Sequence, residues 1–181
     1  MPVYVSMLRG INVSGRNRIP MAELRVLYER HGHSDVTTYV QSGNVVSRAA
    51  SRRALAVEQA IGRAIADDLG LDVAVLVRTP AQLATVLDAS PFVDAGADPK
   101  ALHVTFLATA PAKAKVAALD GDAFAPDRFR VHGREAYLWC PDGYGRTKIN
   151  NTWFERKLGV AATTRNWKTT TQLRLLAREL A

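Results

Sequence analysis

The feature that most restricts the fold of this 181-residue chain is an order of strand and helix patterns that occurs twice. In the first half, short apolar or alternating stretches are typical of strands. These predicted strands are residues 3–10, 35–41, 44–49 and 71–79. Helical spacing of apolar residues fills two intervals, 20–32 and 51–70, and a glycine closes each of them. The predicted order is strand, helix, strand, strand, helix, strand.

The same order follows a polar connector at 90–101 that contains proline and glycine. Its elements are a strand at 101–109, a helix at 111–121, a hairpin at 127–140, a helix at 148–159 and a strand at 160–165. One further helix carries Leu173, Leu176, Ala177 and Leu180 on one face. We therefore predict an α+β protein of tandem, duplicated ferredoxin-like (βαββαβ) halves, residues 1–92 and 93–181. Element order alone supports this duplication.

The net charge of +7 is distributed unevenly along the chain. Residues 1–53 carry 8 Lys/Arg against 3 Asp/Glu, and residues 143–181 carry 8 against 2. The intervening residues 54–142 carry 8 against 12. If the two ends meet in space, they form one basic surface, which attracts phosphates, nucleic acid or other anions. The alternative is a set of separately solvated lysines and arginines.

Composition also restricts the compartment. No apolar run approaches the roughly 20 residues that a membrane helix needs. The N-terminal stretch MPVYVSMLRG lacks the basic start and long apolar core of a secretion signal. Cys140 is the single cysteine, so it forms no internal disulfide. We expect a cytoplasmic protein that does not associate with membranes.

The stretch LRGINVSGRNRIP at 8–20 suggests a ligand site. In a βαββαβ unit the first two strands are parallel, so the end of strand one and the following hairpin turn lie at the same sheet edge. Glycines there allow close backbone approach, and amides, a hydroxyl and guanidinium groups supply hydrogen-bond partners for an anion. The candidates are Arg9, Gly10, Asn12, Arg16, Arg18, Gln41, Ser42, Gly43 and Asn44. The alternative is a pair of well-made turns, since Asn and Gly are ordinary turn residues.

Two later stretches extend this hypothesis. DGYGRTKIN places Arg146 and Lys148 just before a helix, whose N-terminus favours anions, although the spacing is not that of a phosphate loop. TTRNWKTTT brings Arg165, Asn166 and Trp167 to the start of the last helix. Alternatively, Asn166 or Thr169 is a helix cap, and Trp167 is a packed anchor. If the basic ends converge, Arg9 and Arg165 bind the same anion; otherwise such arginines brace loops.

Four stretches together resemble one known family. LRGINVSGRNRIPMAEL, TYVQSGNVV, GYGRTKINNTWFERKLGV and ATTRNWKTTTQL are similar, in this order, to the signature stretches of the bacterial family named domain of unknown function 1697 (DUF1697). The resemblance spans the whole chain. It implies an α+β fold with ferredoxin-like halves and no established activity. The chain departs from the pattern at WKTTT, where relatives often have WNT, which weakens any amide role at Lys168.

No metal site or cofactor is expected from the side chains that bind metals. His31 and His33 flank a helix end, His103 lies in a strand and His132 in a turn, and none has a recognisable triad or ligand set. Cys140 fits a small core residue. No carboxylate pair stands out for acid–base chemistry.

The leading hypothesis from the sequence is a binding protein for an anion that carries phosphate, either a nucleotide or nucleic acid. Nucleic-acid binding is expected to be weak and non-specific, because the strand patterns offer few aromatics for base stacking. The first half has only Tyr4 on its first strand and none on its third, and the second half has Phe106, Tyr137 and Trp139. One alternative is an enzyme acting on a phosphate-containing substrate. Another is a protein-interaction module with a basic face. The oligomeric state stays open.

Overall fold

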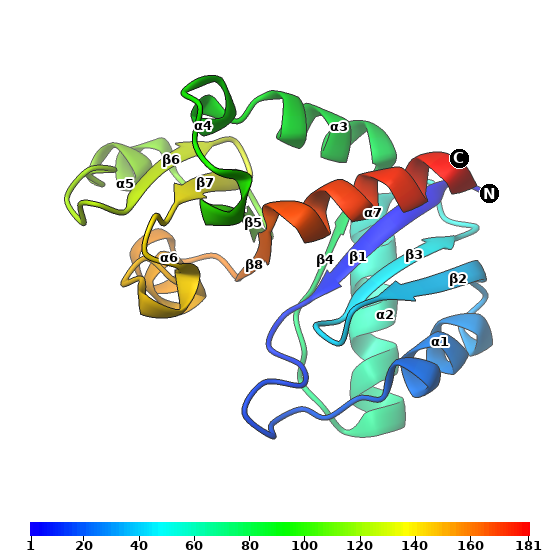
Figure 1. The fold of residues 1–181 in the computed structure, drawn as a ribbon. Helices are drawn as coiled ribbons and strands as arrows, with labels where there is room; N and C mark the ends of the chain where they lie inside the picture. The colour runs from blue at the N-terminus through cyan, green and yellow to red at the C-terminus, as the bar shows by residue number, and fades with distance from the viewer. The chain divides into compact units, whose positions relative to one another are not determined.

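The computed structural model describes all residues, 1–181, and contains two compact units (Figure 1). Unit 1 comprises Met1–Thr85 and Gln172–Ala181, and unit 2 comprises Val86–Thr171. Each unit contains one four-stranded antiparallel sheet. The α+β class is therefore confirmed. The predicted boundary between the two halves of the chain, at residues 92 and 93, stays a prediction.

Unit 1 follows the predicted order of elements. These are β1 (Val3–Leu8), α1 (Met21–Arg30), β2 (Ser34–Tyr39), β3 (Asn44–Arg48), α2 (Ala54–Leu69), β4 (Val75–Arg78) and the start of α3 (Pro80–Asp88). The strand order in the sheet is β2-β3-β1-β4. The strand expected at 71–79 is shorter than predicted, because only Val75–Arg78 pair with β1.

The core of unit 1 lies between its sheet and the helices α1 and α2, which cover one face (Figure 1). The helical spacing of Val57, Ile61 and Ile65 turns one side of α2 inward, where all three are buried. Gly70 ends this helix in the left-handed conformation with φ of 66°, which glycine adopts at little cost. The apolar residues whose spacing predicts this helix are thus the residues that it buries in the core.

The second part of unit 1 is the C-terminal portion of α7 (Trp167–Leu180). Leu176 and Leu180 lie beside Thr37 and Val46 of the sheet. Arg48 of β3 holds both ends of the chain, since its guanidinium donates one hydrogen bond to the carbonyl of Met1 (3.1 Å) and one to that of Leu180 (2.5 Å). Unit 1 is therefore built from segments at opposite ends of the sequence.

His33 makes the stability of unit 1 depend on pH. Its imidazole is 9% exposed, lies within hydrogen-bond distance of the Ser47 hydroxyl (Nδ1 to Oγ, 2.9 Å), and packs edge-on against Tyr28. Burial, and then the nearby His31, lower the pKa of His33 from its usual 6.5. The unfolded chain therefore takes up a proton before the folded one does. The stabilising effect of a neutral His33 is fully present above pH 6.5 and is lost progressively as the pH falls from 6.5 through the lower pKa of the folded state.

Urea denaturation at a series of pH values between 5 and 8, about the range in which histidine titrates, measures this effect. We expect the free energy of unfolding to fall below pH 6.5 with a slope of at most about 1.4 kcal/mol per pH unit for this histidine. His103, whose pKa is also lowered by burial, adds a second contribution in unit 2. His33→Gln is expected to reduce the slope. An unchanged slope in this variant would show that His33 does not titrate with folding.

Unit 2 repeats the order of elements with different lengths. These are α4 (Pro91–Asp94), a 3-10 turn (Pro99–Ala101), β5 (Leu102–Leu107), α5 (Lys113–Ala117), β6 (Arg128–His132), β7 (Glu135–Trp139), a second 3-10 turn (Tyr144–Arg146), α6 (Asn151–Leu158) and β8 (Ala162–Asn166). The strand order is β6-β7-β5-β8. The polar connector predicted at 90–101 contains two short helical segments, α4 and the first 3-10 turn.

Two helices of unit 2 differ in length from the prediction for local reasons. The segment 111–121 contributes only the five residues of α5, because the chain after Ala118 turns through residues 120–122 toward β6. Helix α6 starts at Asn151, since the side chain of Asn150 accepts a hydrogen bond from the N–H of Trp153 (3.0 Å) and caps the helix. Gly159 ends α6 with φ of 73°.

The core of unit 2 is an aromatic cluster between α6 and the sheet. Phe129, Trp153 and Phe154 pack edge to face, with ring centroids 5.0 to 5.4 Å apart. Cys140 is fully buried beside them, which confirms its prediction as a core residue. Burial raises the pKa of the Cys140 thiol to about 11, so the reactive thiolate is strongly disfavoured.

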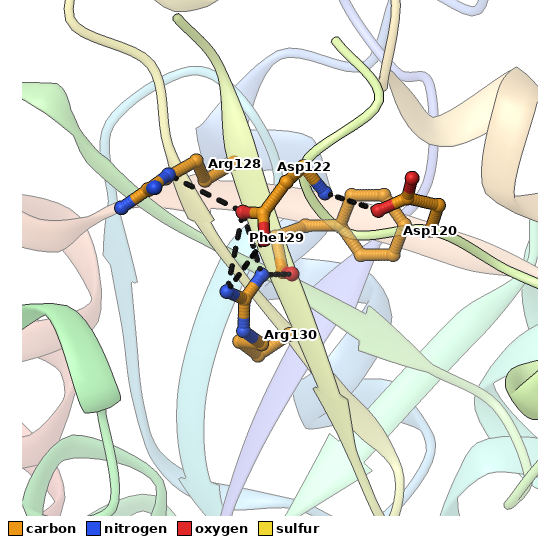
Figure 2. A network of polar contacts seen from close by, with 5 residues as sticks. All are labelled: Asp120, Asp122, Arg128, Phe129 and Arg130. Carbon is orange, nitrogen blue, oxygen red and sulfur yellow. Dashed lines mark hydrogen bonds and ion pairs between the residues drawn. The ribbon is translucent and has the colours of Figure 1, made fainter. Parts of the chain in front are cut away.

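A polar network fastens the segment after α5 to strand β6 (Figure 2). The carboxylate of Asp122 lies 3.2 Å from Nε of Arg128 and 3.2 Å from the guanidinium nitrogens of Arg130. Arg130 also donates to the carbonyl of Phe129 (2.7 Å), and the N–H of Asp122 donates to Asp120 (2.9 Å). Two arginines on alternate positions of one strand thus share one acid.

No helix of the protein is both long and apolar enough to cross a membrane.

Candidate functional site

In unit 1, the loop after β1 and the turn between β2 and β3 lie together, as the strand order requires. The N–H of Leu8 donates to the carbonyl of Gly43 (2.8 Å), and the side-chain amide of Asn12 donates to the carbonyl of Gln41 (2.7 Å). The sequence placed both segments at one sheet edge, and the structure confirms this. We call residues 9–18 and 40–44 the tip of unit 1.

The first segment of the tip is a small, ordered hairpin. Val13 and Arg16 form an antiparallel bridge, and the N–H of Arg16 donates to the carbonyl of Val13 (2.9 Å). Ser14 and Gly15 at its turn have φ of 49° and 75°, and Asn12 and Asn17 at its base have φ of 53° and 46°. Asparagine tolerates this left-handed region better than other non-glycine residues, so its presence at 12 and 17 permits the loop.

The amide of Asn12 braces this hairpin. Its two N–H groups donate to the carbonyls of Ile19 (2.9 Å) and Gln41 (2.7 Å), and its oxygen accepts from the N–H of Ile19 (2.9 Å). The full hydrogen-bonding capacity of the amide N–H groups is therefore used inside the protein. Asn12 positions the loop, as the turn interpretation expects, and a ligand contact from its N–H groups would require those bonds to break.

The second segment of the tip is a tight turn with two unusual backbone positions. Gly43 has φ of 81°, and a Cβ added there would lie 2.6 Å from Cδ1 of Ile11 and 2.9 Å from Cβ of Leu8. Val40, which is exposed, has φ of 51°, a strained conformation for a β-branched residue. Asn44 is buried and donates to the carbonyl of Tyr39 and to the hydroxyl of Ser42, both at 3.0 Å. Glycine at 43 is thus needed for both conformation and packing.

The tip carries three arginines: Arg9, Arg16 and Arg18. The side chains of Arg16 and Arg18 are exposed and form no ion pair or hydrogen bond with the protein. Arg9 is half-buried, and its backbone N–H donates to the carbonyl of Ala74 (2.9 Å). Two available guanidinium groups two residues apart on an ordered hairpin form a surface to which an anion is attracted.

Arg146 and Lys148 lie in unit 2, on the wall of a cleft of about 330 Å³. The segment Ala123–Asp127 and the residues Asp142 and Gly143 also line this cleft. Both basic side chains are exposed. Sequence analysis did not identify Asp127 and Asp142 as candidates. They are 15 positions apart in sequence and line the same cleft because the β6–β7 hairpin brings the segment before β6 close to the segment after β7.

The last group of candidates lies around the end of β8. Arg165 is 7% exposed, and one guanidinium nitrogen donates to the Thr163 hydroxyl (2.7 Å) and the Thr164 carbonyl (3.0 Å). Burial lowers the pKa of Arg165 to about 10, so it stays charged at neutral pH. The side chain of Asn166 accepts from the N–H of Thr169 (2.7 Å), which confirms the cap interpretation, and Trp167 is half-buried. These contacts are those of residues that shape the start of α7.

The candidates therefore form three groups: the tip in unit 1, the cleft residues Arg146 and Lys148, and the β8 residues 165–167. A common anion site for both basic ends stays a prediction. No cluster of three or more histidine, cysteine, aspartate or glutamate side chains is arranged to hold a metal ion. Two of the histidines have other partners: His31 bonds with Asp68 (3.1 Å), and His103 stacks on Tyr144 with centroids 4.7 Å apart.

Comparison with known proteins defines the family but no activity. No protein of the curated collection matches the chain. The structure of the conserved bacterial protein SP0830 from Streptococcus pneumoniae is similar, with a TM-score of 0.76 and 21% sequence identity over 98% of this chain and 99% of that one. At this identity the likeness concerns the fold alone. A family model described as protein of unknown function (DUF1697) matches residues 1–137, which exceeds half of the sequence. The chain belongs to the DUF1697 family.

Proposed function

We propose that the protein binds an anion that carries phosphate, a nucleotide or the backbone of a nucleic acid, through the tip of unit 1. The observation that carries this proposal is the pair of exposed guanidinium groups, Arg16 and Arg18, that have no partner on the protein and lie on the loop 9–18, which Asn12 braces. Because the frame is already ordered, binding would cost little conformational entropy. Planar guanidinium forks match phosphate oxygens in pairs.

The burial of aromatic side chains favours phosphate contacts over base stacking. Tyr4 is 2% exposed and donates its hydroxyl hydrogen to the carbonyl of Ser51 (2.9 Å), while Phe106 and Tyr137 are buried in unit 2. Sequence-selective RNA binding by such sheets uses exposed aromatics. Any nucleic-acid binding is therefore expected to be weak, salt-sensitive and indifferent to sequence.

We also propose that the fold is a duplicated ferredoxin-like architecture. The strand orders β2-β3-β1-β4 and β6-β7-β5-β8 are the same when each set is counted along its own half, and each is the order expected of a ferredoxin-like unit. This supports a duplicated ferredoxin-like architecture. Contributions of Arg146, Lys148, Arg165, Asn166 and Trp167 to the same ligand, and the cytoplasmic location, stay predictions. The alternatives, an enzyme of phosphate-containing substrates and a basic interaction module, have no comparable observation in their favour.

Isothermal titration of the full chain with inorganic pyrophosphate tests the proposal. Arg16→Gln and Arg18→Gln each remove a charge-assisted contact, so each is expected to weaken binding about tenfold. Both side chains are exposed, so the melting temperature is expected to stay within a degree or two. Arg63→Gln, which changes an exposed arginine on α2, is the matched control and is expected to have no effect.

A second titration with a single-stranded oligonucleotide at several salt concentrations separates the two ligand classes. A steep loss of affinity with salt indicates many phosphate contacts, and a shallow loss indicates one or two. Equal affinity of the wild type and the double variant Arg16→Gln/Arg18→Gln for both probes would refute binding at the tip.

A further inference from the structure

We propose that the cleft of unit 2 is a separate site for a small zwitterion, a compound with a protonated amine at one end and a phosphate or carboxylate at the other. Its charged lining consists of Asp127, Asp142, Arg146 and Lys148. This goes beyond the proposed function and replaces the predicted contribution of Arg146 and Lys148 to the anion at the tip of unit 1, because it assigns both residues to a different ligand.

The walls of the cleft are turns whose backbone hydrogen bonds hold them in place. On one wall, the N–H of Asp127 donates to the carbonyl of Phe124 (3.0 Å), and the Phe124 ring packs edge-on against Trp153 with centroids 5.4 Å apart. On the other wall, the N–H of Gly143 donates to the carbonyl of Cys140 (3.0 Å). Both walls are thus anchored in the buried aromatic cluster, and the cleft exists before a ligand arrives.

The basic part of the second wall is equally ordered. The N–H of Arg146 donates to the carbonyl of Gly143 (3.3 Å), and that of Thr147 donates to Tyr144 (3.1 Å). Thr147 and Ile149 are buried, so the exposed Arg146 and Lys148 alternate with inward side chains. This alternation directs both cations away from the core.

The acidic and basic side chains that line the cleft indicate which class of ligand fits it. The four side chains form no ion pair or hydrogen bond with one another or with the rest of the protein, although both signs line one cleft. The opposite charges are therefore more than 4 Å apart, with space between them. A simple anion would be attracted by Arg146 and Lys148 and repelled by Asp127 and Asp142. A zwitterion satisfies both signs at once, because complementary charge on each end meets its partner.

The size and apolar lining of the cleft agree with this class. Its volume of about 330 Å³ lies at the lower end of small-molecule sites. Ala123, Phe124, Ala125 and Pro126 supply the apolar part of the lining. A short hydrocarbon linker between the amine and the anionic group would pack against that surface.

Calorimetric titration of the full chain with phosphoethanolamine and 4-aminobutyrate, against inorganic phosphate and ethanolamine, tests the proposal. We expect at least one zwitterion to bind about tenfold or more tightly than either single-charge probe. Asp142→Asn and Lys148→Gln are each expected to weaken that binding about tenfold, since each removes one charged contact. Lys157→Gln, an exposed change on α6 outside the cleft, and Arg16→Gln are the controls and should leave it unchanged.

Amide NMR spectra locate the ligand independently of affinity, with Gly143 and Gly145 as reporters beside the cleft. Shifts confined to residues around 123–127 and 142–148 support the site. Phosphate that binds as tightly as the zwitterions would overturn the proposal in favour of an anion site. Failure of both zwitterions to bind at millimolar concentration, or equal binding by the two cleft variants and the wild type, would also overturn it. None of these results depends on the pyrophosphate titration of the tip.

Discussion

Gly43→Ala is expected to lower the free energy of unfolding of unit 1 by about 3 kcal/mol. Two costs combine at this position. The left-handed φ of 81° costs an L-residue about 1–2 kcal/mol. The new methyl group would also overlap Ile11 and Leu8, at 2.6 Å and 2.9 Å, and overpacking of a filled site typically costs 1–3 kcal/mol. Because Ile11 belongs to the loop that carries Arg16, the overlap is also expected to displace the tip and weaken pyrophosphate binding.

Gly10→Ala separates these two costs. Gly10 has a similar φ of 67°, but a Cβ there would meet no atom within 4 Å. Its substitution is therefore expected to cost only the conformational part, about 1 kcal/mol. Urea denaturation followed by circular dichroism measures both variants. Equal losses would show that the turn yields to the methyl group and that packing against Ile11 contributes nothing.

Gly121→Ala is expected to have a comparably large effect on unit 2, about 2–4 kcal/mol, for a different reason. No left-handed conformation is involved. A Cβ at this position would lie 2.2 Å from the carbonyl oxygen of Phe129 and 2.6 Å from Nη1 of Arg130. The backbone must therefore move, which breaks the hydrogen bond from the N–H of Phe129 to the carbonyl of Gly121 (3.0 Å). The neighbouring contacts of Asp122 with Arg128 and Arg130 would be lost with it (Figure 2).

Gly145→Ala is the matched control in the same unit. A Cβ there meets nothing within 4 Å and the backbone is not left-handed, so its stability is expected to change by less than about 1 kcal/mol. Thermal unfolding of both variants provides the comparison. A loss in Gly121→Ala no greater than in the control would mean that strand β6 accommodates the methyl group, and that the network of Asp122 is not tied to close backbone approach.

Much of the fold follows from patterns that a sequence displays openly. The spacing of Val57, Ile61 and Ile65 predicts α2, and the His132–Arg134 turn predicts the β6–β7 hairpin. The elements that were missed or overestimated depend on tertiary contacts. Helix α4 forms in a segment rich in turn residues because Phe92 is buried and packs against Trp139, with centroids 5.9 Å apart. No local pattern indicates that contact.

The candidate sites divide in the same way. The approach of the loop at 9–18 to the turn at 41–44 follows from strand order alone, and it was predicted. The internal use of the Asn12 and Asn44 amides depends on which carbonyls the folded loop presents, and sequence does not reveal it. Asp127, Arg146 and Lys148 line one cleft because the β6–β7 hairpin brings the segment before β6 close to the segment after β7, and no local sequence pattern reveals this.

Because unit 1 is assembled from two separate segments, residues 1–85 and 172–181, it cannot be completed until the end of the chain has been synthesised. A polypeptide leaves the ribosome at about 5–20 residues per second, so the last segment of unit 1 follows the first by roughly 4–19 seconds. During that interval the sheet face beside Thr37 and Val46 is not covered by Leu176 and Leu180. The guanidinium of Arg48 also lacks its hydrogen bond to the carbonyl of Leu180. Unit 2 is continuous in sequence and is complete once residue 171 has emerged. The unit that begins first is therefore the one that finishes last.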